Sequence, residues 1–310
     1  MIRWIARLVG IGFVGVLLIA LYGTISGYLT APPAATAESV FHKEPKELHL
    51  ASDGPFGKFD RAQLQRGLQV YTEVCAACHG LTRVTFADLA GLGYKDAQIK
   101  AYAGSGNFWK IDVPSINPET GEPATRKATP ADHFPSPYAN EAQGRAANSN
   151  ALPPDLSLIT KAREGGPAYV YSLLTGFQPQ PAALLKQFPE AKTPQGLYFN
   201  PYFANLNIHM PPPLTSDGQV SYGAGSPKPT VDQMAKDVSA FLVWSAEPKL
   251  ENRHRTGLVV VIFLIFATIL GYLSYQNIWA GAKRKVAPVG VLDPVNQAKR
   301  RRASKKAGIS

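Results

Sequence analysis

The sequence of 310 residues is poor in cysteine and methionine, with two and three residues respectively. Two cysteines cannot form the disulfide framework of a small secreted scaffold. Charged residues are also scarce, at 17% against 45% hydrophobic residues, which excludes a disordered polar chain. The 27 glycines and 26 prolines follow no triplet repeat, so they indicate a loop-rich globular fold and not a collagen-like one.

The formal net charge of +10 is concentrated at one end of the chain. Residues 276–310 contain nine Lys and Arg and one acid, Asp293, whereas residues 38–250 contain 19 Lys and Arg against 20 Asp and Glu. A nucleic-acid-binding domain would have a basic body. We therefore expect no nucleic-acid partner, with RNA binding by Lys299–Lys306 as a weak alternative, and interpret the tail as a topology determinant that contacts membrane lipid.

Two apolar segments flank the body. The first, Leu8–Tyr28, follows Arg3 and Arg7 and precedes the small residues Ala34–Ala37. This order predicts a signal peptide over residues 1–37, with a retained N-terminal membrane anchor as the alternative.

The second apolar segment, Thr256–Ala282, carries no charge. About 20 apolar residues suffice to cross a bilayer as a helix, so we predict a transmembrane helix over residues 253–282. The basic tail, 283–310, then lies in the cytoplasm by the positive-inside rule. The body, 38–252, is predicted to be a periplasmic domain held at the bacterial cytoplasmic (inner) membrane.

The two cysteines form a C-x-x-C-H motif with Cys75, Cys78 and His79. This is the attachment motif of c-type haem, in which both thiols add to haem vinyl groups and the adjacent His binds the iron. A structural zinc site needs four ligands, and no other cysteine is present. A redox dithiol expects a thioredoxin-like alternation of strands and helices, which the sequence lacks.

The motif follows a predicted helix that is capped by Asp60, with Gln63 completing a capping box. Leu64, Leu68, Tyr71 and Cys75 are spaced along one face. Gly67 within this helix indicates close packing of a second helix, predicted to begin at Thr230 and to end before Pro248. We therefore predict a mainly α protein: a small c-type cytochrome fold with long loop insertions, plus one C-terminal transmembrane helix.

A second axial ligand for the iron is not determined by spacing alone. Met234 lies on an apolar helical stripe and is assigned to the core. Met210 precedes three prolines that hold an extended segment, a suitable setting for an axial thioether. His209 and the more distant His133 stay open as rivals, as does a Met210 that only fills an apolar gap.

Longer segments resemble the cytochrome c1 family, the haem subunits of quinol–cytochrome c oxidoreductase. They are RAANSNALPPDLS, FNPYFANLNIHMPPPL and the Thr230 helix followed by the apolar anchor. The resemblance implies one covalent haem c, with thioethers at Cys75 and Cys78 and iron ligands His79 and Met210. It further implies that Arg145 lies near a haem propionate, and that Pro153 and Pro154 wall the haem.

The resemblance also implies a role in a respiratory complex that is dimeric and contains a cytochrome b subunit. The chain would take electrons from a Rieske iron–sulfur protein and pass them to a cytochrome c, without bond chemistry of its own. The alternatives are an anchored cytochrome that carries electrons alone or for a periplasmic dehydrogenase, and a haem-based ligand sensor. The family often has Gly at the position of Asn150. The resemblance also implies that residues 111–154 form a long loop that wraps the haem, whereas their composition alone would equally allow a disordered linker.

Overall fold

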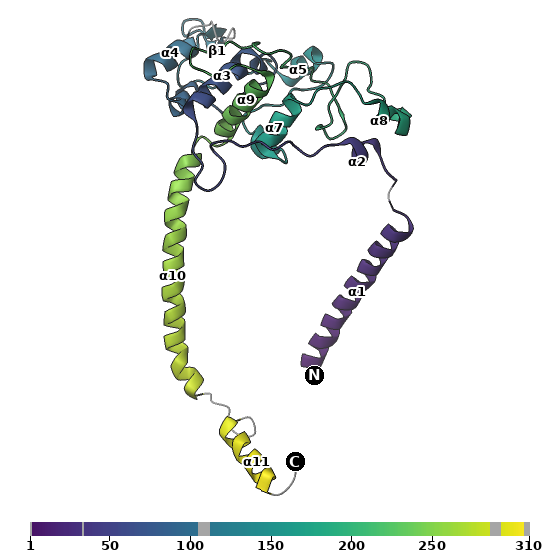
Figure 1. Cartoon of the computed structure of the whole chain (residues 1–310). Coiled ribbons are helices and arrows are strands. Elements are labelled where there is room, and N and C mark those ends of the chain that lie inside the picture. The colour runs from purple at the N-terminus through teal and green to yellow at the C-terminus, as the bar shows by residue number, and fades with distance from the viewer. Residues whose placement is uncertain (1, 33, 105–111, 286–292, 307–310) are drawn as a thin grey trace. The chain divides into compact units, whose positions relative to one another are not determined.

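The computed structural model describes residues 2–32, 34–104, 112–285 and 293–306 (Figure 1). The chain divides into two compact units, residues 1–52 with 59–248 and residues 53–58 with 249–310. The described helices are α1 Ile2–Thr30, α2 Ala37–Phe41, α3 Arg61–Glu73, α4 Asp96–Gly104, α5 Glu141–Ala147, α6 Ile159–Ala162, α7 Gly166–Leu174, α8 Ala182–Gln187, α9 Val231–Ala246, α10 Leu250–Lys285 and α11 Pro294–Lys306. Short 3₁₀ helices are η1 Cys75–Ala77, η2 Phe86–Leu92 and η3 Pro189–Ala191.

Helices α3 and α9 cross at the centre of the first unit, as the sequence predicted. Asp60 caps α3, and its side chain accepts a hydrogen bond from the Gln63 backbone amide at 3.1 Å. The two helices meet at Gly67, where an added Cβ would lie 2.1 Å from the Asp237 carbonyl oxygen and 2.6 Å from Phe241 Cβ. Only glycine permits this approach, which confirms the packing role expected of Gly67.

An ion pair is buried beside the crossing. Arg66 Nε lies 2.8 Å from Asp237 Oδ2, and the Asp237 side chain is fully buried. Gln233 Nε2 donates to the other carboxylate oxygen at 2.8 Å. Burial alone would lower the pKa of Arg66. The hydrogen bond to Asp237 and the charge of that carboxylate outweigh burial and raise the pKa. A buried carboxylate needs such partners, so the pair fixes the register of the two helices.

Aromatic side chains fill the core around the crossing. Tyr71, Phe134 and Phe241 are buried, with ring centroids 6.5 Å apart for Tyr71 and Phe134 and 5.8 Å apart for Tyr71 and Phe241. Trp244 stacks on Phe241 at 5.7 Å. Met234 is fully buried, which places it in the core as predicted. The mainly α fold class is confirmed.

The region expected to be one long loop, residues 111–154, is more structured than its composition suggested. Residue 111 lies outside the described residues. The strands β1 Val113–Ile116 and β2 Pro123–Arg126 pair antiparallel. Further on, Thr85 and His133 form an isolated bridge, and α5 follows. Two more strands of two residues each, β3 Tyr198–Phe199 and β4 Asn207–Ile208, form a second antiparallel pair.

The N-terminal segment before α3 runs across the first unit as a strap, defined here as residues 37–52. Thr36 caps α2, and Phe41 meets Phe188 edge to face at 6.4 Å. Lys43 N donates to Pro201 O at 2.8 Å. The strap therefore joins α8 to the segment that leads to Met210. The cleavage point expected after Ala37 lies inside α2.

The second unit contains α10, whose Leu250–Gly281 portion is long and apolar enough to cross a membrane. The helix begins a few residues before the predicted residue 253. Trp4–Thr30 within α1 of the first unit passes the same test. Residues 286–292 and 307–310 of the predicted tail lie outside the described residues, and residues 294–306 form α11.

Candidate functional site

The C-x-x-C-H motif sits directly after α3. The helix ends at Glu73, and the chain tightens into η1, so Cys75 does not continue the helical face of Leu64 and Leu68. The amides of Cys78 and His79 donate to the Cys75 carbonyl at 3.1 and 2.9 Å. This turn brings two cysteines and a histidine onto one short segment. Both thiols are free; Cys75 is half-buried against the core, and Cys78 is exposed.

The Cys75 thiol lacks the lowered pKa of a reactive cysteine. Burial raises the pKa of the Cys75 thiol to about 12. Redox-active C-x-x-C motifs depend on a lowered thiol pKa, which supplies the reactive thiolate. Among the described residues, no group of three or more His, Cys, Asp and Glu side chains could hold a metal ion.

His79 is oriented by a single strong contact. Its Nδ1 lies 2.8 Å from the carbonyl oxygen of Pro154. Because a carbonyl only accepts hydrogen bonds, Nδ1 carries the proton and Nε2 presents its lone pair. Burial lowers the pKa of His79, although the Pro154 bond and the Asp155 charge oppose that shift. The neutral imidazole is the form that binds metals, and a carbonyl that accepts from the other ring nitrogen fixes its tautomer.

The segment around Pro154 is tied to the residues that follow His79. The Asp155 carboxylate accepts from the amide and hydroxyl of Thr82 at 2.8 and 2.9 Å and from the Ser157 amide at 2.9 Å. Leu156 N donates to Gly80 O at 2.9 Å. From the other side, the buried Tyr71 hydroxyl donates to the His79 carbonyl at 2.9 Å. His79 is thus held on a rigid frame.

These features fit a haem bound through two thioethers and one imidazole. The donor set consists of two unpaired thiols and a histidine whose free nitrogen is already aimed away from its carbonyl partner. Pro154, expected to wall the haem with Pro153, contributes its backbone oxygen as well.

Met210 lies on the loop after β4, ahead of the three prolines, and is half-buried. Its rivals are less protected: His209 and His133 are exposed, and the His133 backbone is engaged in the bridge to Thr85. Met210 is thus the least exposed of the three candidate ligands.

The segment that carries Met210 docks on the end of α7 through Asn200, which is fully buried. Its Nδ2 donates to Leu173 O at 2.8 Å, and its Oδ1 accepts from Tyr202 N at 3.1 Å. At Gly176 an added Cβ would lie 2.4 Å from the Tyr202 ring. Sequence reasoning missed Asn200, because a lone asparagine in a loop has no distinguishing pattern.

Arg145 is exposed in the last turn of α5. Its Nη1 donates to Asn150 O at 3.2 Å, and its own carbonyl accepts from the Asn150 amide at 2.8 Å. Arg145 thus braces the turn that leads to Pro153. Asn150 adopts a left-handed φ of 68°, a conformation that suits Gly and that Asn tolerates. The departure noted at Asn150 therefore preserves the turn.

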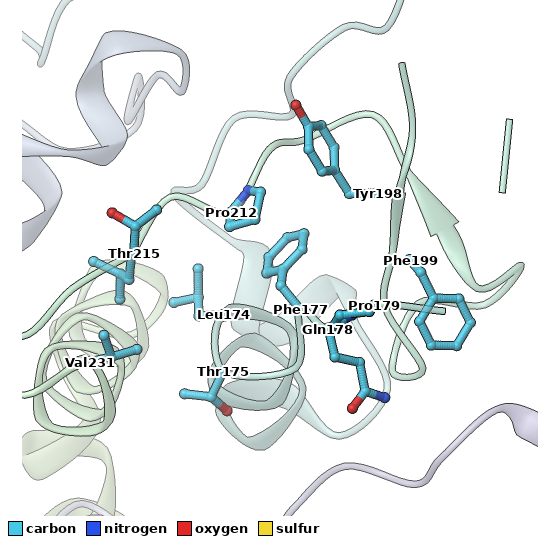
Figure 2. A pocket seen from close by; sticks show the side chains of 11 residues that line it. Leu174, Thr175, Phe177, Gln178, Pro179, Tyr198, Phe199, Pro212, Thr215 and Val231 are labelled. Carbon is cyan, nitrogen blue, oxygen red and sulfur yellow. The ribbon is translucent and has the colours of Figure 1, made fainter. Parts of the chain in front are cut away.

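A cavity of about 450 Å³ opens between the end of α7, the N-terminus of α9 and the proline loop after Met210 (Figure 2). Figure 2 shows Pro212 and Phe177 close to its centre, with Val231 and Phe199 on opposite sides. The lining residues are Leu174, Thr175, Phe177, Gln178, Pro179, Tyr198, Phe199, Pro212, Leu214, Thr215 and Val231. None of them belongs to the C-x-x-C-H motif, so this cavity borders the Met210 loop and not the cysteines.

A c-type cytochrome combines a helical fold with a C-x-x-C-H segment whose histidine can bind a metal through Nε2. The described residues show this arrangement. The model of the Cytochrome C1 family matches residues 50–282. The cytochrome c1 of Rhodospirillum rubrum is 44% identical over 244 residues, 74% of this chain and 85% of that protein. The mitochondrial cytochrome c1 haem protein of Saccharomyces cerevisiae is 42% identical over 257 residues, 83% of this chain and 78% of that protein.

A third relative, the cytochrome b/c1 of Bradyrhizobium diazoefficiens, is 49% identical over 243 residues, 73% of this chain. That protein is much longer, and the match covers only 34% of it. The chain belongs to the cytochrome c1 family, which implies a haem cofactor and confirms the resemblance identified from the sequence.

Proposed function

We propose that this chain is the electron-transfer haem subunit of a quinol–cytochrome c oxidoreductase. The observation that carries the proposal is the His79 Nδ1 to Pro154 contact of 2.8 Å within a C-x-x-C-H segment of a cytochrome c1 family member. It leaves Nε2 free to bind iron, a state that a core histidine with two satisfied nitrogens would not have. Haem c supplies one-electron redox chemistry when bound.

The chain's own residues have separate tasks in this proposal. Cys75 and Cys78 would hold the cofactor covalently, and His79 and Met210 would ligate its iron. Methionine as the second ligand raises the reduction potential of a haem. The high potential suits an acceptor for a Rieske centre, whose potentials span about −150 to +300 mV. Arg145 would offset the charge of a propionate, and Pro153 would border the ring.

The family and the apolar helix α10 support the inferred partners and location. The relative from Bradyrhizobium diazoefficiens is named cytochrome b/c1, and one from Candida albicans is named a cytochrome b-c1 complex catalytic subunit. We infer that this chain assembles with a cytochrome b subunit and a Rieske iron–sulfur protein in a dimeric complex, and reduces a cytochrome c. The haem domain lies in the periplasm, α10 spans the bacterial inner membrane, and the basic tail is cytoplasmic.

The test of the ligand assignment is Met210→Leu. We expect a lower haem potential in a redox titration, loss of the charge-transfer band of thioether-ligated ferric haem, and stalled quinol-dependent cytochrome c reduction. His209→Asn, one residue away and exposed, is the matched control and should leave the potential unchanged. A Met210→Leu protein with the parental potential would remove Met210 as the ligand.

Co-purification separates this function from an anchored cytochrome that works alone or for a dehydrogenase. We expect a b-type cytochrome and an iron–sulfur protein to accompany the chain through detergent purification. A pyridine haemochrome spectrum on the same sample tests for haem c. Carbon monoxide binding to the reduced protein would favour a ligand sensor, because His/Met ligation leaves no open iron position.

A further inference from the structure

A tight turn at residues 54–57 exposes an aromatic side chain beside the membrane helix. Gly57 N donates to Gly54 O at 3.3 Å, which closes the turn, and Gly54 adopts a left-handed φ of 75°. Pro55 and Phe56 lie at the tip. Phe56 is 73% exposed. Exposure of a phenyl ring to water is unfavourable, because apolar surface has a lower free energy in an apolar environment.

This turn belongs to the same compact unit as α10. His254 Nδ1 lies 3.2 Å from Gly57 O, so the turn is fixed to the first part of that helix. His254 precedes Gly257, the start of the strongly apolar run, by three residues, or about 4.5 Å of helical rise. The interfacial layer on each side of a bilayer is roughly 5–7 Å thick. The turn therefore lies in the interfacial layer of the bilayer if α10 crosses the membrane.

The two ends of α10 differ in aromatic content. In its last part, Tyr272 stacks on Tyr275 with ring centroids 6.5 Å apart, and Trp279 is tilted against Tyr275 at 6.1 Å. Residues 250–262 contain no Trp, Tyr or Phe. Trp and Tyr are normally enriched at both interfaces of a membrane helix, and Phe is among the residues that enter the boundary between headgroups and acyl chains. Phe56 supplies the missing ring at the first interface from outside the helix.

Charge in the same unit agrees with a lipid surface. Lys58 directly follows the turn and is exposed, as are Lys249, directly before α10, and Arg255 in the second turn of that helix. Basic side chains at this height attract lipid phosphates. We propose that the Gly54–Gly57 turn is a membrane-interface anchor, in which Phe56 inserts at the level of the lipid headgroups. The proposal rests on α10 being the membrane span of the proposed function.

The experiment uses the full haem-loaded chain in phosphatidylcholine nanodiscs, with a nitroxide label on Phe56→Cys. In the proposed holoprotein Cys75 and Cys78 are thioethers, so one label per chain is expected. Power-saturation EPR then compares collisions with oxygen, which partitions into lipid, and with a water-soluble nickel chelate. Ile116→Cys, at a strand position 68% exposed, is the aqueous control, and Val259→Cys, at a helix position 63% exposed, is the lipid control.

We expect a several-fold higher oxygen-to-nickel ratio at position 56 than at position 116, approaching the ratio at position 259. A ratio at 56 equal to that at 116, with 259 in lipid, would overturn the inference alone. Protection of position 56 from both reagents would also overturn it, because a protein would then cover the turn. An aqueous ratio at 259, or three labels per chain, would instead refute the membrane helix or the covalent haem of the proposed function.

Discussion

Asp132 shows how one side chain holds a segment that has little regular structure. Its carboxylate accepts from Arg126 Nη1 and Nη2 at 2.6 and 2.7 Å and from the Thr129 amide and hydroxyl at 2.7 Å each. Its carbonyl accepts from Phe86 N at 3.0 Å. The hydrogen bonds from Arg126, with those from Thr129, outweigh burial and hold the pKa of Asp132 well below its usual range.

The lowered pKa of Asp132 makes the free energy of unfolding depend on pH in a defined direction. The folded state binds the proton less readily than the unfolded state, so the stabilisation is complete above about pH 5 and is lost as the pH falls toward the folded pKa. Asp132→Asn should cost about 1 kcal/mol at pH 7, because the pair is partly exposed and screened. The difference from the parent should shrink toward pH 3 in urea unfolding curves.

Glu119→Gln is the matched control for this titration, since Glu119 is exposed in the β1–β2 turn. We expect it to change neither the stability at pH 7 nor its acid dependence. A pH-independent difference between Asp132→Asn and the parent would contradict the assigned role of the charge.

At the scale of elements, the α3–α9 crossing depends on the missing side chain of Gly67. Gly67→Ala gains about 1 kcal/mol of helix propensity but forces a Cβ to within 2.1 Å of the Asp237 carbonyl. Backbone atoms cannot move aside as a flexible side chain would, so we expect a net loss of roughly 3 kcal/mol. Thermal unfolding of the holoprotein measures it.

Gly104→Ala serves as the control for Gly67→Ala, because Gly104 is also a helical glycine, the last residue of α4. Its added Cβ would meet only Ala128 O, at 3.9 Å. That variant should be neutral or slightly stabilising. Equal unfolding temperatures for both variants would show that the crossing tolerates separation of the helices.

The strap adds a second link between elements through Lys46. Its Nζ donates to Thr175 Oγ1 at 2.7 Å, and it lies 5.7 and 5.4 Å from the ring centroids of Tyr171 and Tyr202. Burial lowers the pKa of Lys46, while the Asp232 carboxylate opposes that shift. Lys46 thus connects the end of α7 with the segment that carries Met210.

Lys46→Met should therefore loosen the Met210 loop as well as cost about 1–2 kcal/mol of stability. We expect the thioether charge-transfer band to disappear at a lower urea concentration than in the parent. Lys46→Arg should restore part of the difference. Lys43→Met, on an exposed strap residue whose contact is made by its backbone, should have no effect. Identical behaviour of the Lys46 and Lys43 variants would contradict this link.

The elements differ in how well they could be predicted from the sequence. Helices α3 and α9 were predictable because capping residues and periodic apolar positions encode them locally. The β1–β2 hairpin was missed, since its strands contain Pro114 and Pro123 and bury little on either face. Cys75 was placed on a helical face that in fact ends at Glu73. The contact of His79 with Pro154 joins positions 75 residues apart, which no local pattern reveals.

At the scale of the whole molecule, the near-neutral part of the chain and the basic excess lie in different units. The near-neutral residues 38–250 lie almost entirely in the first unit, and the basic excess lies in the second. The first unit contains the buried core and every proposed haem ligand. The second contributes α10, in which the most apolar 18-residue stretch of the candidate span Leu250–Gly281 has no buried residue. Attachment to the membrane and tuning of the haem are therefore separable properties.

A chain that ends at Pro248 tests this separation. We expect it to keep one covalent haem and the parental potential, because it removes no residue of the proposed site. If residues 1–37 are cleaved, the product should appear in the soluble periplasmic fraction, whereas the full chain stays with the membrane. N-terminal sequencing of the product then gives the cleavage point. A truncated protein that keeps Trp4–Thr30 and sediments with the membrane would show instead that α1 is a second anchor. Loss of the Met-ligated spectrum on truncation would contradict the independence of the two units.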